Sequence, residues 1–376
     1  MLIYFAFIIP IITIVLLVIF FRKNMVWWEY LLNFCVPATL IIIAKVISTT
    51  SQTHDTEIWN NYLTSASYEE EWNEWIDKTC YHTCYDQCKN SDGTTSSCNP
   101  HDCHPYDCSY CQNHPPEWSA STNSGKHISL NPYQFESYCK LWGKRNFVEM
   151  NRDYHTKDGN KFTSAPGGDI NHVIPVTTQH TYENRVKCSR SVFNFQDVDS
   201  EEVVEYGLYE YPRMDMFNYN PIQGYTDVKA SKRLQQYNAR LGSAKQVHMM
   251  ILVFKDKPVS AFLSQEAYWK GGNKNEFTLC IGLKNGKTEW AKVISWTEVD
   301  ELKKAVEVQV ASMPFDLVKI TDYMAGQVGA KFIRKQFKEF SYITVEPTTG
   351  ALIWTLLLTL VLSVGLAVFN VKNDIE

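Results

Sequence analysis

Long apolar runs at both ends of the chain predict three membrane-spanning helices. Leu2–Phe21 and Ala351–Phe369 contain no charged residue, and a helix of roughly 20 such residues crosses a bilayer core of about 30 Å. A further apolar run, Val26–Ile47, begins at a cluster of Trp and Tyr residues that is typical of a membrane interface. We therefore predict a first transmembrane helix with its cytoplasmic loop at residues 1–24, a second helix at 25–47, a third at 350–370 and a cytoplasmic tail at 371–376.

The basic residues beside these runs set the predicted orientation. Arg22 and Lys23 fill the short loop between the first two runs, and positively charged loops stay on the cytoplasmic side of a membrane. The first run has no basic segment before it and no small-residue cleavage site after it, so we interpret it as a retained helix and not as a signal peptide. Residues 48–350 are then expected outside the cytoplasm.

Three segments are predicted between the second and third runs. Residues 48–125 read as a Cys-rich helix-loop segment, residues 126–244 as a mixed connecting region, and residues 245–340 as an α/β domain. The expected fold class is therefore a membrane-anchored protein of the α+β and α/β type. It combines three transmembrane helices, the Cys-rich segment and a C-terminal layered α/β sandwich.

Seven cysteines crowd between residues 80 and 111 and predict a segment stapled by disulfides. We expect a helix at Ser67–Lys89, along which Cys80, Cys84 and Cys88 recur every four residues on one stripe. Neighbours on such a stripe rarely bridge one another, because their Cβ vectors run parallel, so each is expected to pair with a cysteine of the polar loop at 90–116. An even number of cysteines in an exported region is typical of a disulfide framework. The disulfide candidates are Cys80, Cys84, Cys88, Cys98, Cys103, Cys108, Cys111, Cys139, Cys188 and Cys280.

The same cluster has an alternative interpretation as a metal site. Cys80-x3-Cys84 followed by Cys108-x2-Cys111 approximates the four-thiolate pattern of structural zinc sites, and interspersed histidines could substitute. Zinc is the cofactor that this pattern suggests. An oxidising compartment favours disulfides and a reducing cytosol favours the metal, so topology and cysteine chemistry form one question. The predicted orientation favours the disulfides.

Apolar runs alternate with amphipathic stretches in the C-terminal half, which predicts an α/β unit. Gln246–Phe254 and Glu276–Leu283 are typical of buried strands, with a helix expected between them from Pro258 to Lys270. Asn285-Gly286 signals a hairpin into a third strand at Thr288–Trp296. Strand, helix, strand predicts a parallel pairing of the first two strands through a right-handed crossover.

Two helices are predicted after the third strand. Thr297 with Asp300 three residues later matches a capping box and is expected to open the first of them. The second is expected at about Asp316–Phe340, a stretch with many Lys and Arg residues.

Part of this unit resembles the TPM-type domains, which are extracytoplasmic α/β domains. Trp269–Asn275, running into the strand Phe277–Ile281, resembles their helix-end, glycine, asparagine and apolar-strand segment. Met313-Pro314-Phe315 followed by Asp322-Tyr323 and Gly326 resembles their second motif, with Thr321 where a glycine is expected. The resemblance covers residues 245–340 and implies the fold of that region. Some members of the family are acid phosphatases, and others serve the assembly or repair of membrane complexes.

An interaction module is the function that these observations predict. The sequence has no nucleophile elbow, phosphate-binding loop, His-Glu-x-x-His motif or dinucleotide-binding glycine loop. Its formal net charge of −5 and its lack of a basic stripe exclude a nucleic-acid-binding protein. We expect a membrane-anchored extracytoplasmic interaction or assembly module of a bacterial inner membrane or of a phage. Its partners would be the lipid bilayer and another membrane or envelope protein.

Two alternatives stay open. The first is a divalent-metal-dependent phosphohydrolase on the α/β domain, with Asp316 and Asp322 as the candidate catalytic residues and Asp256 and Asp300 as further ligands. Hard cations need such carboxylate oxygens to converge on one point. The second is a zinc-stapled structural membrane protein whose soluble region is cytosolic.

Overall fold

The computed structural model describes residues 2–21, 25–152, 156–189, 193, 195–212, 215–217 and 219–373. The loop Arg22-Lys23-Asn24, on which the predicted orientation rests, lies outside the described residues, as do residues 374–376 of the predicted tail. The chain divides into two compact units. The first comprises residues 1–59, 177–235 and 244–376, and the second comprises residues 60–176 and 236–243. The predicted segments 48–125 and 126–244 each contribute to both units.

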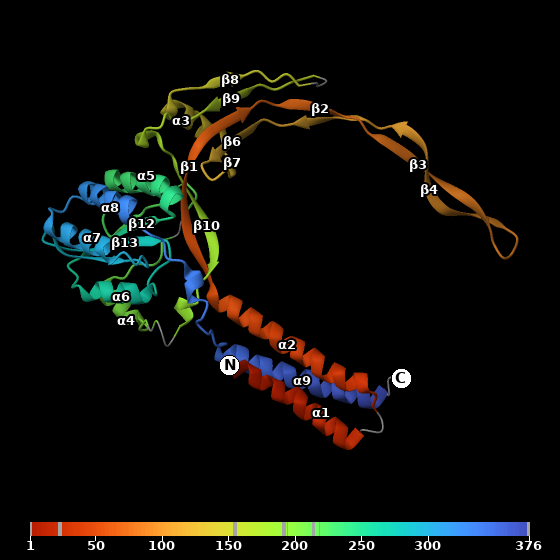
Figure 1. The fold of residues 1–376 in the computed structure, drawn as a ribbon. Coiled ribbons are helices and arrows are strands. Elements are labelled where there is room, and N and C mark those ends of the chain that lie inside the picture. Colours follow the sequence, from red (N-terminus) through yellow and green to blue (C-terminus); the bar gives the residue numbers. More distant parts are fainter. Residues whose placement is uncertain are drawn as a thin grey trace. The chain divides into compact units, whose positions relative to one another are not determined.

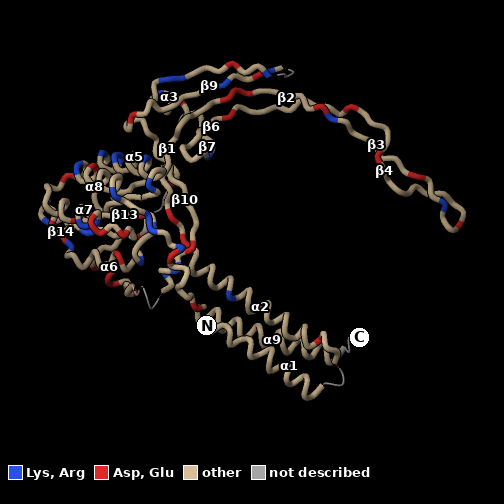
Figure 2. Tube along the Cα trace, in the orientation of Figure 1, with Lys and Arg blue, Asp and Glu red and all other residues tan. Residues whose placement is uncertain are grey.

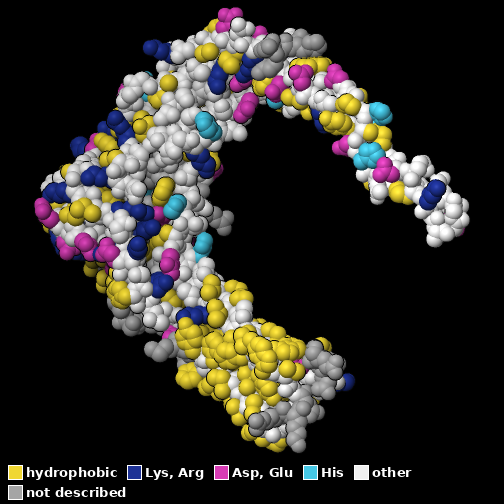
Figure 3. All heavy atoms as spheres, turned by 45° about the vertical axis from the view of Figure 1, so that its right-hand side comes forward, with side chains coloured by type: hydrophobic (Ala, Val, Ile, Leu, Met, Phe, Trp, Pro, Cys, Tyr) yellow, Lys and Arg dark blue, Asp and Glu magenta, His cyan; other side chains and the backbone are white. Residues whose placement is uncertain are grey.

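Three helices of the first unit are long and apolar enough to cross a bilayer. They are α1 (Ile8–Phe21) with the preceding 3-10 turn η1 (Leu2–Phe7), α2 (Trp27–Thr53) and α9 (Thr349–Asn373). Figure 2 shows few Lys, Arg, Asp or Glu residues along these helices, and Figure 3 shows hydrophobic side chains covering the face of the bundle that it presents. Large apolar side chains turned outward in this way match the predicted contact with lipid.

The three helices pack against one another along a shared apolar seam. Ile3, Ala6 and Ile41 are buried together, and Leu352 and Leu356 pack against them. Figure 1 shows the end of α9 beside the beginning of α2, so these two helices run in opposite directions. Pro37 lies inside α2, which membrane helices tolerate better than soluble ones do.

A four-stranded sheet forms the α/β part of the first unit. Its order is β11 (Ile222–Gln223), β12 (His248–Lys255), β13 (Glu276–Lys284) and β14 (Lys287–Ile294). β11, β12 and β13 are parallel, and β14 returns antiparallel to β13. The predicted parallel pairing and the hairpin at Asn285-Gly286 are therefore confirmed.

Helices attach to this sheet through apolar contacts. α6 (Ser260–Tyr268) follows β12 as predicted, and its Ala261 and Phe262 are buried with Leu252 and Phe254. The remaining elements of the unit are α4 (Ser200–Tyr206), α5 (Val228–Lys245), which continues into the second unit, α7 (Asp300–Ser312), α8 (Leu317–Lys331), and the 3-10 turns η4 (Val186–Cys188) and η5 (Phe337–Phe340).

Two helix boundaries differ from those predicted. α7 begins at Asp300 with Val299 at its N-cap and no side-chain cap, so the capping box at Thr297 is wrong. α8 ends at Lys331, and only the short turn η5 follows, so the helix predicted to reach Phe340 is too long. Phe337 and Phe340 lie in this turn instead of in α8, and they are buried in a hydrophobic cluster with Val186 and Ile343.

The second unit contains most of an antiparallel sheet, the helix α3 and part of α5. Strands run in the order β7 (His127–Ser129), β6 (Glu117–Thr122), β1 (His54–Glu69), β9 (Lys161–Ser164) and β8 (Asn146–Val148), and β10 (Pro175–Glu183) also pairs with β1. Tyr68 stacks on Trp118 and Phe162 across these strands. The helix α3 (Pro132–Trp142) begins after Asn131, which caps it by accepting a hydrogen bond from the Gln134 amide at 2.8 Å. A 3-10 turn, η3 (Ile170–His172), lies further along the chain.

Four strands replace the predicted Cys-rich helix and loop. β2 (Trp72–Ile76) pairs with β5 (Tyr110–His114), and β3 (Thr79–Lys89) pairs with β4 (Thr95–Asp107), both antiparallel. The helix predicted at Ser67–Lys89 is therefore wrong, and so is the unstructured loop at 90–116. Tyr, Thr and Trp residues, which favour strands, are frequent in this stretch. We call residues 72–114 the hairpin arm; Figure 1 labels its strands β2, β3 and β4.

Candidate functional site

Three disulfides cross the hairpin arm at regular intervals. They join Cys80 to Cys108, Cys84 to Cys103 and Cys88 to Cys98, with Cα–Cα distances of 5.8, 5.7 and 5.9 Å. Each cysteine of β3 thus pairs with a cysteine of the segment that follows. This pairing was predicted, but the three cysteines lie on a strand and not on the predicted helix. In β3 and β4 the cysteines alone are partly buried, and every other residue is exposed. The disulfides therefore take the place of a hydrophobic core.

Unequal spacing on the two strands is absorbed by bulges. The cysteines recur every four residues on β3 and every five on β4, so each interval leaves one residue of β4 without an opposite partner. The strand register skips Asn99 and His104. Both have positive φ angles, +46° and +45°, as a bulge residue in the left-handed region does. Asn and His are among the residues that tolerate this region best.

The arm has two chemically different faces, because side chains alternate across a strand. On β3, Tyr81 and Tyr85 lie on the face opposite to the cysteines, and their cross-strand neighbours are Pro105 and Pro100. Both tyrosines are more than half exposed, at 53% and 57%. Four residues of strand separate them, or about 13 Å. This face therefore presents two exposed tyrosines, each paired with a proline.

The cysteine face carries the histidines. His82 lies opposite Cys103, and His101 lies opposite Cys84. The His82 ring lies 4.6 Å from the ring of Tyr106, and His101 Nδ1 lies 3.9 Å from the carboxylate of Asp86. Figure 3 shows histidine side chains along the arm.

The predicted four-thiolate zinc site is not assembled. Cys80, Cys84 and Cys108 are each in a disulfide, and Cys111 is free and exposed. Among the described residues, the one group of three metal-type ligands within 4.8 Å is Cys84, Cys103 and His104. Because two of its sulfurs are joined to each other, that group offers thiolates to a metal only after reduction.

The other predicted disulfide partners stay free. Cys139 and Cys280 are buried, and Cys188 is half-buried. Burial raises the pKa of all three thiols, most strongly at Cys280 in the core of the sheet. They therefore behave as small apolar residues, and of the ten cysteines of the soluble region six are paired.

The carboxylates proposed for a phosphohydrolase serve other roles. Asp316 caps α8 by accepting the amides of Val318 and Lys319, each at 3.1 Å. Asp322 pairs with Arg233 at 2.9 Å, and Asp300 pairs with Lys303 at 2.7 Å. Asp256 occupies a turn at φ +54°. Within the described part of the chain these four are in no three-ligand group.

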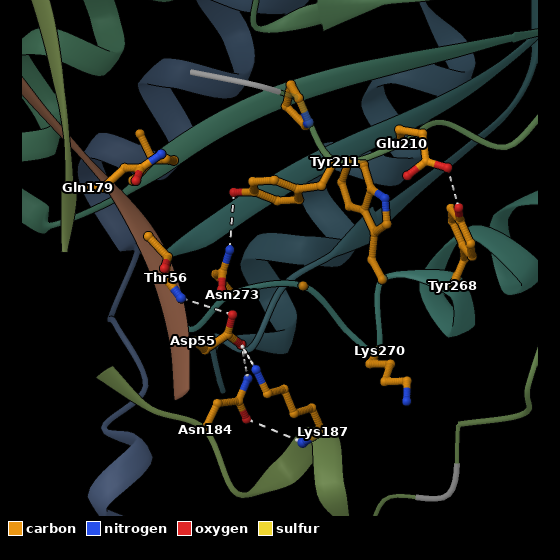
Figure 4. A pocket seen from close by; sticks show the side chains of 14 residues that line it. Asp55, Thr56, Gln179, Asn184, Lys187, Glu210, Tyr211, Tyr268, Lys270 and Asn273 are labelled. Carbon is orange, nitrogen blue, oxygen red and sulfur yellow. Dashed lines mark hydrogen bonds and ion pairs between the residues drawn. The ribbon is translucent and has the colours of Figure 1, made fainter. Parts of the chain in front are cut away.

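A polar cavity of about 880 Å³ in the first unit was not foreseen from the sequence. Its wall comes from β1, β10, the segment after α4 and the turn that follows α6. Figure 4 shows Tyr211 and Asn273 pointing toward one another, with Asp55 and Lys187 below them. The Asn184 amide donates to Asp55 at 2.7 Å, and the Lys187 ammonium lies 3.6 Å from the same oxygen.

A buried carboxyl group, Glu276, lies behind this cavity. Asn273 donates to it from its backbone amide at 2.9 Å and from its side chain at 2.7 Å, and the Tyr211 hydroxyl donates to it as well. Burial raises the pKa of Glu276, and Tyr211 and Asn273 oppose that rise. Burial also raises the pKa of Tyr182 and of Tyr211, so both hydroxyls stay protonated and act as donors. Perturbed groups beside a cavity are typical of a ligand-binding site.

Comparison with known proteins adds no relative. No protein-family model matches the chain, and neither a curated protein nor a solved structure matches it significantly.

Proposed function

We propose that this protein is a membrane-anchored extracytoplasmic interaction module and that the hairpin arm is its binding element. The three apolar helices support the anchor, and the three disulfides suggest an oxidising compartment for the soluble region. The observation that carries the proposal is a rigid element without a core of its own. An isolated two-stranded hairpin is marginally stable in water. Three disulfides that stabilise such a hairpin are therefore expected where a fixed hairpin shape is needed for binding.

The Tyr–Pro face is the proposed contact surface, and the partner is a protein recognised through side chains. Tyrosine supplies a large, rigid contact area with a polar tip at little entropic cost, and it is enriched at binding hot spots. Pairing of a partner strand along β4 is disfavoured, because Pro100 and Pro105 remove donors and the bulges at Asn99 and His104 bend the edge. We therefore infer docking on the face of the arm and not along this edge.

The TPM-type resemblance stands as a proposal for the fold of residues 245–340. The order β12, α6, β13, β14 supports it, and a layered α/β arrangement belongs to the same proposal. The phosphohydrolase alternative gains no support from the carboxylates, which cap helices or pair with basic residues. The polar cavity near Asp55 and Asn273 supports, as a second candidate, the binding of a small polar ligand.

Site-specific photocrosslinking in the producing cell tests the binding role without knowledge of the partner. A photoreactive phenylalanine analogue placed at Tyr81 or Tyr85 is expected to capture one discrete protein. The matched control is Tyr133, which is 82% exposed in the same unit but lies off the arm on α3. The double substitution Y81S/Y85S should weaken co-purification of that protein at least about tenfold, since each hot-spot side chain contributes about 2 kcal/mol. Equal capture from Tyr133, or undiminished co-purification, would contradict the proposal.

A further inference from the structure

The end of α2 that leads into β1 has the side chains of a headgroup layer and not those of a hydrocarbon core. Every side chain from Ser48 to Thr53 carries a hydroxyl or an amide group. The adjoining part of α9 carries Trp354, which is 65% exposed, and exposed tryptophan is typical of a membrane interface. If these helices span a bilayer, this level of the bundle lies among the lipid headgroups.

An apolar groove of about 740 Å³ runs along α2 and α9 to the same level. Its lining extends from Cys35 to Ser51 on α2, a length of about 24 Å at about 1.5 Å per residue. Ile43 and Leu358 stay exposed beside it, and Ala351 contributes only a methyl group to its wall. One leaflet is half of a bilayer core of about 30 Å, so the groove is long enough for an acyl chain.

A second cavity, of about 1260 Å³, lies where the groove ends, and we call it the junction cavity. Thr348 lines both the groove and this cavity, and Gln52 and Thr349 line the cavity at the ends of α2 and α9. Lys187 and Lys270 line the junction cavity and also the polar cavity described above. The groove and the two cavities thus adjoin one another in sequence, and all of these residues belong to the first unit.

The two lysines lie near the end of α2. Cys188 Sγ donates to Gln52 O at 3.0 Å. Burial raises the pKa of this thiol, and the ammonium groups of Lys187 and Lys270 both oppose the rise, so both lie within electrostatic reach of one sulfur atom. Figure 4 shows the two lysines on the same side of the polar cavity. Lysines at the level of the headgroups are suited to contact a lipid phosphate.

The charges around the junction cavity do not favour an anionic lipid. Asp197 and Glu346 line it together with Lys187 and Lys270, and the Lys187 ammonium also lies 3.6 Å from Asp55. Carboxylates therefore balance the two ammonium groups among the described residues. A headgroup that carries both a negative and a positive charge matches this balance better than one with a net negative charge.

The polar cavity offers groups that suit the positive charge of such a headgroup. Glu210 accepts a hydrogen bond from the Tyr268 hydroxyl and has no ion-pair partner within the described part of the chain. The rings of Tyr211 and Trp269 line the same cavity, with their centroids 5.3 Å apart and their planes at 62°. A carboxylate beside aromatic rings is suited to bind an ammonium group. Lys270 follows Trp269 in the chain, so the groups for the two charges adjoin each other.

We propose that this part of the first unit binds one zwitterionic phospholipid. An acyl chain lies in the groove, the phosphate contacts Lys187 and Lys270, and the ammonium group lies against Trp269 and Glu210. The Lys270 ammonium is exposed and makes no ion pair or hydrogen bond with the residues that the structure describes, so it is free to donate to a phosphate oxygen. The inference rests on the proposal that the helices span a bilayer, deepens the second candidate function of the polar cavity, and is independent of the hairpin arm.

Native mass spectrometry of the full-length protein, purified from membranes in a mild detergent, tests the site. Retention of the protein in membranes washed at alkaline pH is measured first, so a failed anchor is distinguishable from a failed lipid site. Phosphatidylethanolamine, phosphatidylcholine and phosphatidylglycerol with identical acyl chains are then titrated, as are phosphoethanolamine and phosphocholine, which are headgroups without chains. We expect one lipid per chain, with one or both zwitterionic lipids bound at least about tenfold tighter than phosphatidylglycerol, which brings no positive charge to Glu210. The free headgroups should bind more weakly, because they leave the groove empty.

Three variants and a control separate the parts of the site, and the Tm of each shows that it is folded. K270S and E210S each remove one of the charges and should weaken binding of the zwitterionic lipid at least about tenfold. A351F should fill the groove and weaken binding of the lipid but not of the free headgroup. K287S is the control, because Lys287 is an exposed lysine of the same unit at the start of β14 that lines neither the groove nor either cavity.

The lipid titrations can overturn the proposal in three ways. Equal affinity for all three lipids would show that the headgroup charge is not recognised. Free headgroups that bind as tightly as the lipids would exclude the groove from the site. Unchanged affinity in K270S or in E210S would show that these two side chains do not contact the headgroup.

Discussion

His248 at the start of β12 is fully buried, and burial lowers its pKa to about 3. The unfolded chain takes up a proton near the ordinary histidine pKa of about 6.5, but the folded protein does not. The unfolded state therefore binds more protons between these two values, and the free energy of unfolding decreases as the pH falls through this window. The contribution of neutral His248 is complete above pH ~6.5 and is lost progressively below it.

Replacement of His248 by a residue that does not titrate should remove this pH dependence. Between pH 7 and pH 5 we expect the wild-type protein to lose about 2 kcal/mol of stability that H248Q does not lose, since one pKa unit corresponds to about 1.4 kcal/mol. The measurement is the Tm of both proteins across this range in one detergent. Parallel pH profiles would show that His248 takes up its proton in the folded state.

Single residues in the sequence predicted a structural feature correctly only where that feature is formed by residues that are neighbours along the chain. Asn285-Gly286 forms the turn that it predicts, whereas Thr297 does not cap α7. The cavity was not predictable, because Asp55, Tyr211 and Asn273 are far apart in the sequence and meet only through the fold. No local pattern reports such convergence.

At the scale of elements, the hairpin arm shows how one spacing fits two structures. Cysteines every four residues share one stripe of a helix, whose period is 3.6, and also share one face of a strand, whose period is 2. The signal that separates them is the return segment, where Cys98, Cys103 and Cys108 recur every five residues. Three successive disulfides with one bulge between each pair of them explain why the cysteine spacing is four residues on the first strand and five on the return segment. We call these three disulfides the ladder. This short repeat was not recognised from the sequence.

The bulge at His104 allows a prediction about how fast the neighbouring disulfide is reduced. A β-branched residue is strongly disfavoured at positive φ, whereas glycine is not. H104V should therefore strain the backbone beside the Cys84–Cys103 disulfide and speed the reduction of that disulfide by a dithiol, while H104G should not. Mass spectrometry of alkylated peptides over time measures the rate for each disulfide.

T83V provides the control, because Thr83 lies in regular strand pairing opposite Asp102. It should leave the reduction rate unchanged. If H104V and H104G are reduced at the same rate, the backbone at His104 does not hold the disulfide in place.

At the scale of the whole molecule, anchoring and cysteine chemistry support each other. The long apolar runs located the ends of the three apolar helices to within six residues, since an uncharged run about 20 residues long has few alternatives to a membrane span. The six paired cysteines suggest an oxidising compartment for the soluble region. That is the compartment that Arg22 and Lys23 predict by the charge rule.

Thiol accounting on intact membranes tests this account most directly. A membrane-impermeant maleimide is applied before and after reduction, and the labelled cysteines are mapped by mass spectrometry. The account predicts that Cys111, which is free and exposed, reacts at once, whereas the six cysteines of the ladder react only after reduction. Labelling of the ladder without reductant, and only after the membrane is permeabilised, would contradict the account by placing the hairpin arm, in reduced form, in the cytosol.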